Sequence, residues 1–116
     1  MKEQLVSFEV AKLAKEVGFN LKTHYCYLDE YNFKPFIEKV KCMSAPTQSL
    51  IQKWLRETYS IYISIKTHLN LDGKYLFSFN YYLNNKIVKN NKRFKTYEEA
   101  LENGLIECLK HLKKNL

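Results

Sequence analysis

The sequence predicts a single α+β domain, residues 1–116, in which a three-stranded antiparallel meander has helices packed on one face. Segments with the period of amphipathic helices open and close the chain, and runs of alternating apolar residues lie between them. With 46% hydrophobic and 27% charged residues, the chain has the balance of a globular domain with a real core. The expected order is helix–irregular–helix–β–β–β–helix, with residues 1–45 as N-terminal helix and irregular segment and residues 46–114 as an αβββα core.

The N-terminal part contains one clear helix and one stretch without a dominant period. Residues 4–17 carry apolar side chains mostly at helical spacing, and Gly18 is placed to end this helix. Within residues 20–45, Tyr25–Leu28 reads as a short strand and residues 33–40 as a second one. Because disordered segments are poor in aromatic residues, the many aromatics here predict an ordered segment packed on the main body.

Residues 46–58 predict the second helix. A proline at residue 46 suits the first helical turn, where its missing N–H has no partner to lose. Trp54 is expected to anchor the core rather than to bind a ligand. Two i,i+4 pairs lie on one face of this helix: Leu50 with Trp54, and Ile51 with Leu55.

The first two strands and their register follow from the alternation of apolar residues. The runs 59–69 and 75–83 alternate apolar with polar residues on either side of a turn. A two-residue turn at Asp72-Gly73 would place polar residues of one strand opposite apolar residues of the other. One further turn residue, with Gly73 in a left-handed bulge, instead pairs Ile65 with Phe79 and Ile63 with Tyr81. A bulged or longer hairpin loop is therefore predicted.

The third strand and the last helix complete the core. Asn84-Asn85 predicts a second turn, followed by a weaker strand from Lys86 to about Phe94 whose lysines suit the edge of a sheet. The last helix starts at a capping box, Thr96-Tyr97-Glu98-Glu99, and continues as an apolar stripe. The sheet is expected to bury its odd-numbered face under the helices and to leave the other face open.

The net charge of +7 makes nucleic acid one candidate partner, but it has a second interpretation. Seventeen of the 19 basic residues are lysines, and arginine, the preferred residue for bidentate phosphate and base contacts, occurs only as Arg56 and Arg93. Abundant lysine, asparagine, tyrosine and isoleucine is also what an AT-rich gene encodes without any selection for binding. Composition is compatible with both interpretations.

The basic charge is concentrated on the predicted sheet. Between Thr58 and Tyr97, seven basic residues stand against the single acidic residue Asp72. With tyrosines on the same open face, this pattern is typical of a nucleic-acid-binding surface, in which lysines contact phosphates and aromatic rings stack on bases. The alternative is that the lysines only protect an edge strand from pairing with another chain. The candidate binding site is the open face and its basic edge: Tyr62, Lys66, His68, Asn80, Tyr82, Lys86, Lys89, Lys92 and Arg93.

The sequence carries no signature of catalysis or metal binding. His24, Cys26 and Cys42 come nearest to a ligand set, but no Cys-x-x-Cys or His-x-x-x-His spacing occurs, and the three glycines are too far apart for a nucleotide-binding loop. We therefore expect no catalytic residue, no metal and no cofactor. An enzyme would need a pocket in which titratable groups converge around His24, Cys26 or His68.

Cysteine content and hydropathy indicate the cellular compartment in which the protein is expected. Three cysteines at wide, unpatterned spacings indicate no disulfide framework and suit a reducing cytosol. No apolar run reaches the length of a membrane span, and the first residues lead into an amphipathic pattern rather than a signal segment. A cytoplasmic location without a membrane partner is expected.

The order helix–three strands–helix over residues 46–114 resembles the double-stranded RNA-binding domain in topology and length. In that family, lysines at the start of the final helix bind phosphates. The matching segment here is Lys95-Thr96-Tyr97-Glu98-Glu99-Ala100, in which only Lys95 corresponds to the basic cluster and the two carboxylates would repel phosphate.

Three blocks, Val6–Phe19 (VSFEVAKLAKEVGF), Ser44–Glu57 (SAPTQSLIQKWLRE) and Phe94–Leu105 (FKTYEEALENGL), resemble an uncharacterised family of small phage and prophage proteins. The resemblance implies a mobile-element setting inside a bacterial host cell and carries over no functional residues. The sequence thus favours a small non-catalytic binding protein that contacts a host or phage macromolecule. That partner is a protein or a nucleic acid, and pairing of an exposed strand edge across a two-fold axis would give a homodimer.

Overall fold

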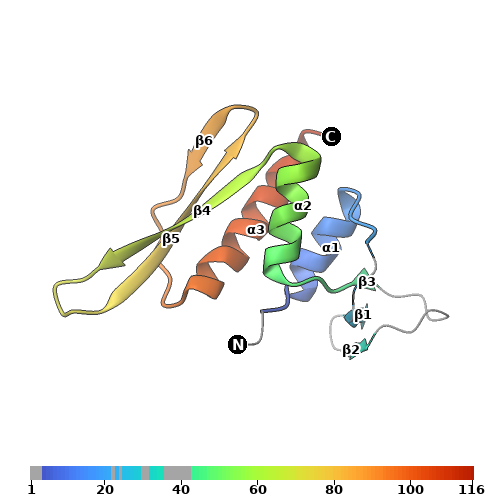
Figure 1. Ribbon diagram of the computed structural model, residues 1–116, viewed down its shortest axis with the longest axis horizontal. Coiled ribbons are helices and arrows are strands. Elements are labelled where there is room, and N and C mark those ends of the chain that lie inside the picture. Colours follow the sequence, from blue (N-terminus) through green and yellow to red (C-terminus); the bar gives the residue numbers. More distant parts are fainter. Residues whose placement is uncertain (1–3, 22, 24, 30–31, 36–42) are drawn as a thin grey trace.

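The computed structural model describes residues 4–21, 23, 25–29, 32–35 and 43–116, and it confirms the α+β fold class. The described elements are three helices and two antiparallel sheets, with the strand orders β2-β1-β3 and β4-β5-β6 (Figure 1). Along the chain these elements are α1 (Phe8–Glu16), β1 (Tyr25–Asp29), β2 (Asn32–Pro35), β3 (Met43–Ser44), α2 (Gln48–Tyr59), β4 (Tyr62–Leu69), β5 (Tyr75–Leu83), β6 (Lys86–Lys89) and α3 (Tyr97–Lys114).

The β4-β5-β6 sheet is the meander that the sequence predicts, and it has the predicted register. Ile65 lies opposite Phe79, and Ile63 lies opposite Tyr81. These odd-numbered residues belong to the core or pack against it, as their alternation with polar residues indicates. A shift by one residue would have exchanged the two faces of β5, so this register decides which side chains stay accessible.

Both hairpin loops of this sheet use left-handed backbone conformations. Gly73 has a φ of +81°, and the N–H of Asn70 donates to the carbonyl of Lys74 at 2.8 Å, which closes a loop longer than two residues, as predicted. The second loop places Asn84 and Asn85 at φ values of 54° and 63°. This is the conformation of a two-residue hairpin turn with matching strand twist, and it explains the asparagine pair.

The third strand is shorter than predicted. Regular pairing of β6 with β5 ends at Lys89 and returns only as a single bridge at Phe94. Between these points, the side-chain oxygen of Asn90 accepts a hydrogen bond from the N–H of Lys92 at 2.7 Å. This local turn takes the place of strand pairing, which is a known competition for asparagine.

The helix α3 covers the odd-numbered face of the sheet. It starts after Thr96, whose side-chain oxygen accepts a hydrogen bond from the N–H of Glu99 at 3.1 Å. Buried leucines of α3 share the core with Phe79 and Tyr81 of β5. At Gly104 the helix backbone reaches the ring of Phe79 directly, because no side chain separates them.

The helix α1 lies against α3, on the side away from the β4-β5-β6 sheet (Figure 1). It starts later than predicted, because the side chain of Ser7 caps it by accepting a hydrogen bond from the N–H of Val10 at 3.3 Å. Its predicted stop is confirmed. Gly18 has a φ of +105°, and the N–H of Phe19 donates to the carbonyl of Ala14 at 2.9 Å, as in a Schellman motif.

The helix α2 begins at Gln48 rather than at residue 46, because Thr47 is its cap and accepts a hydrogen bond from the N–H of Leu50 at 3.1 Å. Trp54 packs against the core as expected. Its ring makes edge-to-face contacts with Phe19, at 5.2 Å between centroids, and with Tyr59, at 5.5 Å. These aromatic contacts tie α2 to the end of α1.

Part of the segment predicted to be irregular forms the second sheet. Its predicted first strand is confirmed as β1, and β2 coincides with the start of the second, whose residues 36–40 lie outside the described part of the chain. The hydroxyl of Tyr27 donates to the carbonyl of Val6 at 2.7 Å, which joins this sheet to the main body. Cys26 is disulfide-bonded, so the expectation of no disulfide is wrong at this position. The spacing of the cysteines is therefore not an argument for location in a reducing compartment such as the cytosol.

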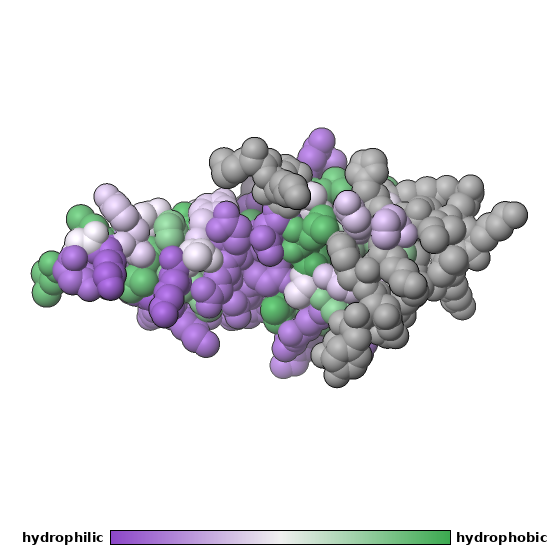
Figure 2. Space-filling model, turned by 90° about the horizontal axis from the view of Figure 1, so that it is seen from below, coloured by the Kyte–Doolittle hydropathy of each residue, from purple (hydrophilic) through white to green (hydrophobic). Residues whose placement is uncertain are grey.

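The molecule is elongated, with extents of 52 × 32 × 21 Å. The β4–β5 hairpin extends beyond the helices, and the side chains near its end are exposed, including Leu69, Leu71 and Tyr75 (Figure 1). Figure 2 shows apolar residues at this far end, on the left, beside strongly hydrophilic ones. The hairpin therefore presents both of its faces to solvent over part of its length.

Candidate functional site

The side of the sheet turned away from α3 is called the open face. The strand register assigns ten residues to it, because side chains alternate between the two faces along each strand. Tyr62 and Tyr82 on this face are 52% and 45% exposed, so no helix in the described part of the chain covers them. The ten residues are Tyr62, Ser64, Lys66 and His68 of β4, Leu76, Ser78, Asn80 and Tyr82 of β5, and Ile87 and Lys89 of β6.

A row of apolar and aromatic side chains crosses one end of the open face. Tyr62 lies directly opposite Tyr82 on the neighbouring strand, and Tyr82 lies directly opposite Ile87 on β6. All three are more than 40% exposed. Directly opposed side chains on paired strands lie close enough to act as one surface. The open face therefore carries an aromatic platform that spans three strands.

The centre of the open face is a network of polar side chains. The side-chain oxygen of Asn80, in the amide orientation that satisfies its hydrogen bonds, accepts from Nζ of Lys66 at 3.1 Å. The ring Nε2 of His68 and the hydroxyl of Ser78 are 2.7 Å apart. Asn80 and Ser78 are only 5% exposed because these two neighbours lie over them. Lys66 is thereby held over the sheet instead of extending freely into solvent.

Six of the nine residues proposed from the sequence share the open face: Tyr62, Lys66, His68, Asn80, Tyr82 and Lys89. The other three belong to the basic edge but not to this surface. Lys86 pairs with the buried Leu83 and so points to the α3 side. Lys92 lies over the ring of Phe94, 5.7 Å from Nζ to the centroid. Arg93 is exposed in the segment that follows β6.

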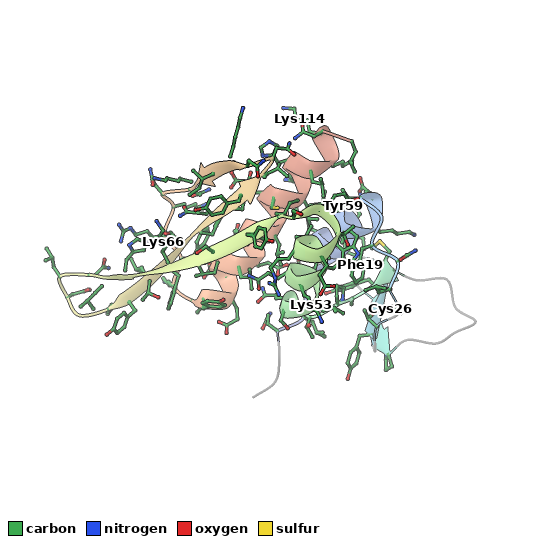
Figure 3. All side chains as sticks on the ribbon, turned by 45° about the horizontal axis from the view of Figure 1, so that its top comes forward. Phe19, Cys26, Lys53, Tyr59, Lys66 and Lys114 are labelled. Carbon is green, nitrogen blue, oxygen red and sulfur yellow. The ribbon has the colours of Figure 1, made fainter. Side chains whose placement is uncertain are left out.

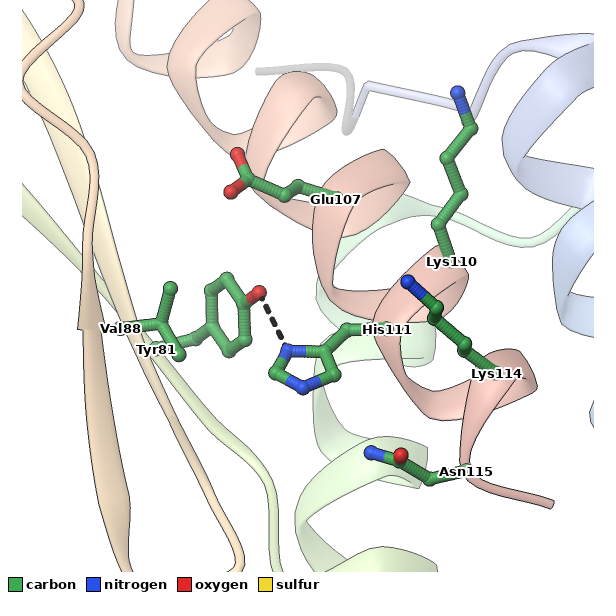
Figure 4. A pocket seen from close by; sticks show the side chains of 7 residues that line it. All are labelled: Tyr81, Val88, Glu107, Lys110, His111, Lys114 and Asn115. Atoms are coloured by element: carbon green, nitrogen blue, oxygen red, sulfur yellow. Dashed lines mark hydrogen bonds between the residues drawn. The ribbon is translucent and has the colours of Figure 1, made fainter.

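On the other side of the edge strand, a groove runs between β6 and α3. Its main cavity has a volume of about 620 Å³ and is lined by Tyr81, Val88, Glu107, Lys110, His111, Lys114 and Asn115 (Figure 4). A smaller cavity of about 280 Å³, lined in part by Lys92 and Phe94, shares Glu107 and Lys110 with it. We call the two together the β6–α3 groove.

The polar contact at the centre of the β6–α3 groove is between Tyr81 and His111, whose hydroxyl oxygen and Nδ1 are 3.0 Å apart (Figure 4). Burial, followed by the nearby carboxylate of Glu107, raises the pKa of Tyr81 to about 12. The hydroxyl stays protonated at neutral pH, so it serves as a hydrogen-bond partner and not as a base. Sequence reasoning missed this pair because it counted Tyr81 as apolar. A tyrosine in the core needs a hydrogen-bond partner for its hydroxyl, and this need was the available signal in the sequence.

Neither of the two described cysteines offers an accessible free thiol. Cys26 is disulfide-bonded, and burial raises the pKa of Cys108 to about 12. Cys26 lies far across the molecule from Lys66, with the helices between them (Figure 3). His24 and Cys42 lie outside the described residues. Among the residues that the structure describes, no three His, Cys, Asp or Glu side chains gather as a metal site would require.

The carboxylates of the helices have partners away from the open face. The pKa of Glu16 is lowered, chiefly because its carboxylate accepts a hydrogen bond from Lys113. Four further glutamates in the described part of the chain contact residues of the helices or of the loop after β6, whereas Asp72 accepts a hydrogen bond from the N–H of Lys74 in the β4–β5 loop. The glutamate contacts join Glu9 to Lys110 at 3.3 Å, Glu57 to Lys53 at 3.9 Å, Glu102 to Gln48 at 2.9 Å, and Glu107 to Asn90 at 2.9 Å.

Comparison with protein-family models, with curated proteins and with solved structures gives no match. None of the helices in the described part of the chain has an apolar stretch of the length that crossing a membrane requires. The assignment of a function therefore depends on the geometry and charge of the open face and of the β6–α3 groove.

Proposed function

We propose that this chain is a small non-catalytic binding protein that contacts another macromolecule through the open face of its β4-β5-β6 sheet. The observation that carries the proposal is the pairing of Tyr62 with Tyr82 on an uncovered surface. Exposed aromatic groups that form a contiguous patch mark interaction surfaces in soluble proteins. The other face of the same strands already supplies the core, so the fold does not require these rings to be aromatic.

The form of the open face suits contact with a large partner. Its central polar groups are tied to one another, as Lys66 is to Asn80 and His68 is to Ser78. Side chains that are already ordered lose less conformational freedom when a partner binds. Two open cavities lie away from this face, in the β6–α3 groove.

Three sequence blocks resemble small phage and prophage proteins, so the proposal places this chain in a bacterial cell that carries a phage or prophage. In that setting the partner is a macromolecule of the phage or of its bacterial host. A catalytic function through cysteine would need a reactive thiol beside a cavity. Cys26 and Cys108 do not provide one, because the first is disulfide-bonded and the second is fully buried.

The proposal is tested with two variants of matched composition. The face variant carries Tyr62→Ser and Lys66→Gln, which remove an exposed ring and a charge from the open face. The control variant carries Tyr75→Ser and Lys86→Gln. Tyr75 is 61% exposed on the opposite side of β5, and Lys86 points to the α3 side. Far-ultraviolet circular dichroism and thermal unfolding establish that both variants keep the fold.

Affinity capture from bacterial extract, followed by quantification of the bound proteins and nucleic acids, gives the readout. We expect the wild-type protein and the control variant to retain the same macromolecules and the face variant to lose them. Equal retention by the face variant and the wild-type protein would contradict the proposal. Loss in the control variant alone would move the binding surface to the β6–α3 side.

A further inference from the structure

The charge of the open face limits the kind of partner that it can bind. Its register positions include Lys66 and Lys89 but no carboxylate. The single acidic residue between Thr58 and Tyr97 is Asp72, in the loop at the far end of the hairpin. The chain as a whole carries a net charge of +7. A partner of complementary charge is therefore a polyanion.

The aromatic platform narrows the choice among polyanions. Tyr62 and Tyr82 present half-exposed rings side by side on adjacent strands. Flat rings on a sheet are stacking surfaces for nucleic acid bases, and every base offers a face for such stacking. Tyrosines also occur in protein–protein interfaces, but a nucleic acid strand uses both features of this surface, since its bases stack on the rings and its phosphates meet the lysines. The observations therefore favour nucleic acid.

The strand state of the nucleic acid follows from the shape of the surface. In a duplex the faces of the bases are stacked on each other, so they cannot reach Tyr62 or Tyr82. Reading a duplex through its grooves usually takes a helix or ribbon that enters them and arginines that contact bases. Tyr62 and Tyr82 lie at the end of the β4–β5 ribbon opposite its protruding loop, and Arg93 is the one arginine in the segment from Thr58 to Tyr97.

The lysines are placed to contact the backbone of a strand that stacks on the tyrosines. Lys89 lies two residues along β6 from Ile87, a separation of roughly 7 Å along the strand. Lys66 lies on β4, and its bond to Asn80 holds the ammonium near the middle of the sheet. Both charges thus lie on the same face as the aromatic platform, on its side toward the β4–β5 loop.

We infer that the open face binds single-stranded nucleic acid, with bases stacked on Tyr62 and Tyr82 and phosphates contacted by Lys66 and Lys89. This inference rests on the proposed function, because it names the partner class of the same surface. Contact through stacking and charge carries little base-sequence preference. Both RNA and DNA strands offer these two features, and the experiment separates them.

Fluorescence polarisation tests the inference at near-physiological salt with the wild-type protein and three double variants. The probes are labelled uridine and thymidine oligonucleotides of about 12 nucleotides, a duplex of the same length, and a polyglutamate peptide. The tyrosine variant is Tyr62→Ser with Tyr82→Ser, and the lysine variant is Lys66→Gln with Lys89→Gln. The control is Tyr75→Ser with Lys86→Gln, which changes the same residue types outside the open face.

We expect at least one single-stranded probe to bind roughly tenfold or more tightly than the duplex, with a further roughly 10-fold to 100-fold loss in the tyrosine variant. The control should bind like the wild-type protein, and the preferred oligonucleotide shows whether RNA or DNA is the better ligand. Equal binding of duplex and single strand, or of polyglutamate, with loss only in the lysine variant, overturns this inference and leaves the proposed function standing. Equal behaviour of all three variants and the wild-type protein on every probe overturns both.

Discussion

Gly104 of α3 lies directly against Phe79 of β5, so closely that a β-carbon added at Gly104 would be 3.1 Å from Cγ of the phenylalanine ring. The ring is 1% exposed and stacks on Phe94 with 6.1 Å between centroids, so it has little room to move. Interiors packed this closely respond even to one added methyl group. The absence of a side chain at Gly104 sets how near α3 comes to the sheet.

The Gly104→Ala substitution tests this contact. Alanine gains about 1 kcal/mol of helix propensity over glycine, but overpacking of a filled core costs about 1–3 kcal/mol. We expect the free energy of unfolding to fall by about 1 kcal/mol, measured by urea denaturation. In a Phe79→Leu background the same substitution should be neutral or stabilising. A stabilising effect of Gly104→Ala in the wild-type background would show that the ring yields easily.

The β5–β6 turn gives a second stability prediction. Asn84 and Asn85 both have positive φ, and Leu83 pairs directly with Lys86 across them. Asn85→Gly should stabilise the protein slightly, and Asn85→Ala should destabilise it by about 1 kcal/mol, because a side chain other than asparagine disfavours this conformation. Thermal unfolding provides the measurement. Asn91→Ala, at an exposed asparagine of ordinary φ, is the control and should change little; an equal loss there would contradict the turn argument.

Alkaline pH should destabilise the protein through Cys108. Burial raises the pKa of this thiol from 9.0 to about 12. Below pH 9 the thiol is protonated in both states, so its full contribution to stability is present. Between the two pKa values the unfolded chain loses the proton while the folded protein keeps it, and stability falls as the pH rises.

Urea unfolding at several pH values from 8 to about 11 checks this pH dependence. Cys108→Ala should lower stability at neutral pH but flatten the alkaline decline by about 1 kcal/mol per pH unit. Tyr81, whose pKa is also raised, leaves part of the decline in place. An identical slope in the variant and the wild-type protein would mean that the thiol does not contribute.

The fold of residues 46–114 was largely predictable, because each local sequence pattern there is compatible with only one type of secondary structure. Placing Ile63 and Ile65 opposite aromatic residues forced the longer loop, and Gly73 was the residue that could form it. The apolar pattern does not predict the starts of two helices, because Ser7 and Thr47 cap them from outside that pattern. The pattern also does not predict the end of β6, because a hydrogen bond of the Asn90 side chain competes there with strand pairing.

The candidate site was predictable only where the two-residue period of strands fixes the direction of side chains. It placed Tyr62, Lys66 and Tyr82 on one surface. It did not separate Lys86 from Lys89, because their faces depend on where the Asn84-Asn85 turn sets the register. The Tyr81–His111 contact joins residues 30 positions apart, so the need of the Tyr81 hydroxyl for a partner does not identify His111 as that partner.

The salt dependence of oligonucleotide binding should report the lysines of the open face individually. For single strands, the logarithm of the binding constant falls with the logarithm of salt concentration by about 0.7 for each neutralised phosphate. Lys66→Gln and Lys89→Gln should each reduce this slope by about that amount. Lys53→Gln, at an exposed lysine paired with Glu57 on α2, should leave the slope unchanged. A slope that falls as much with Lys53→Gln would indicate attraction by net charge alone.

The central claim is that the open face is the binding surface, and chemical-shift mapping by nuclear magnetic resonance tests it most directly. The ¹⁵N-labelled protein is titrated with the oligonucleotide that binds best. We predict that the largest shifts occur at Tyr62, Lys66, Asn80, Tyr82 and Lys89, while α1 and α2 stay unchanged. Shifts concentrated instead at Val88, His111 and Lys114, in the β6–α3 groove, would contradict the claim.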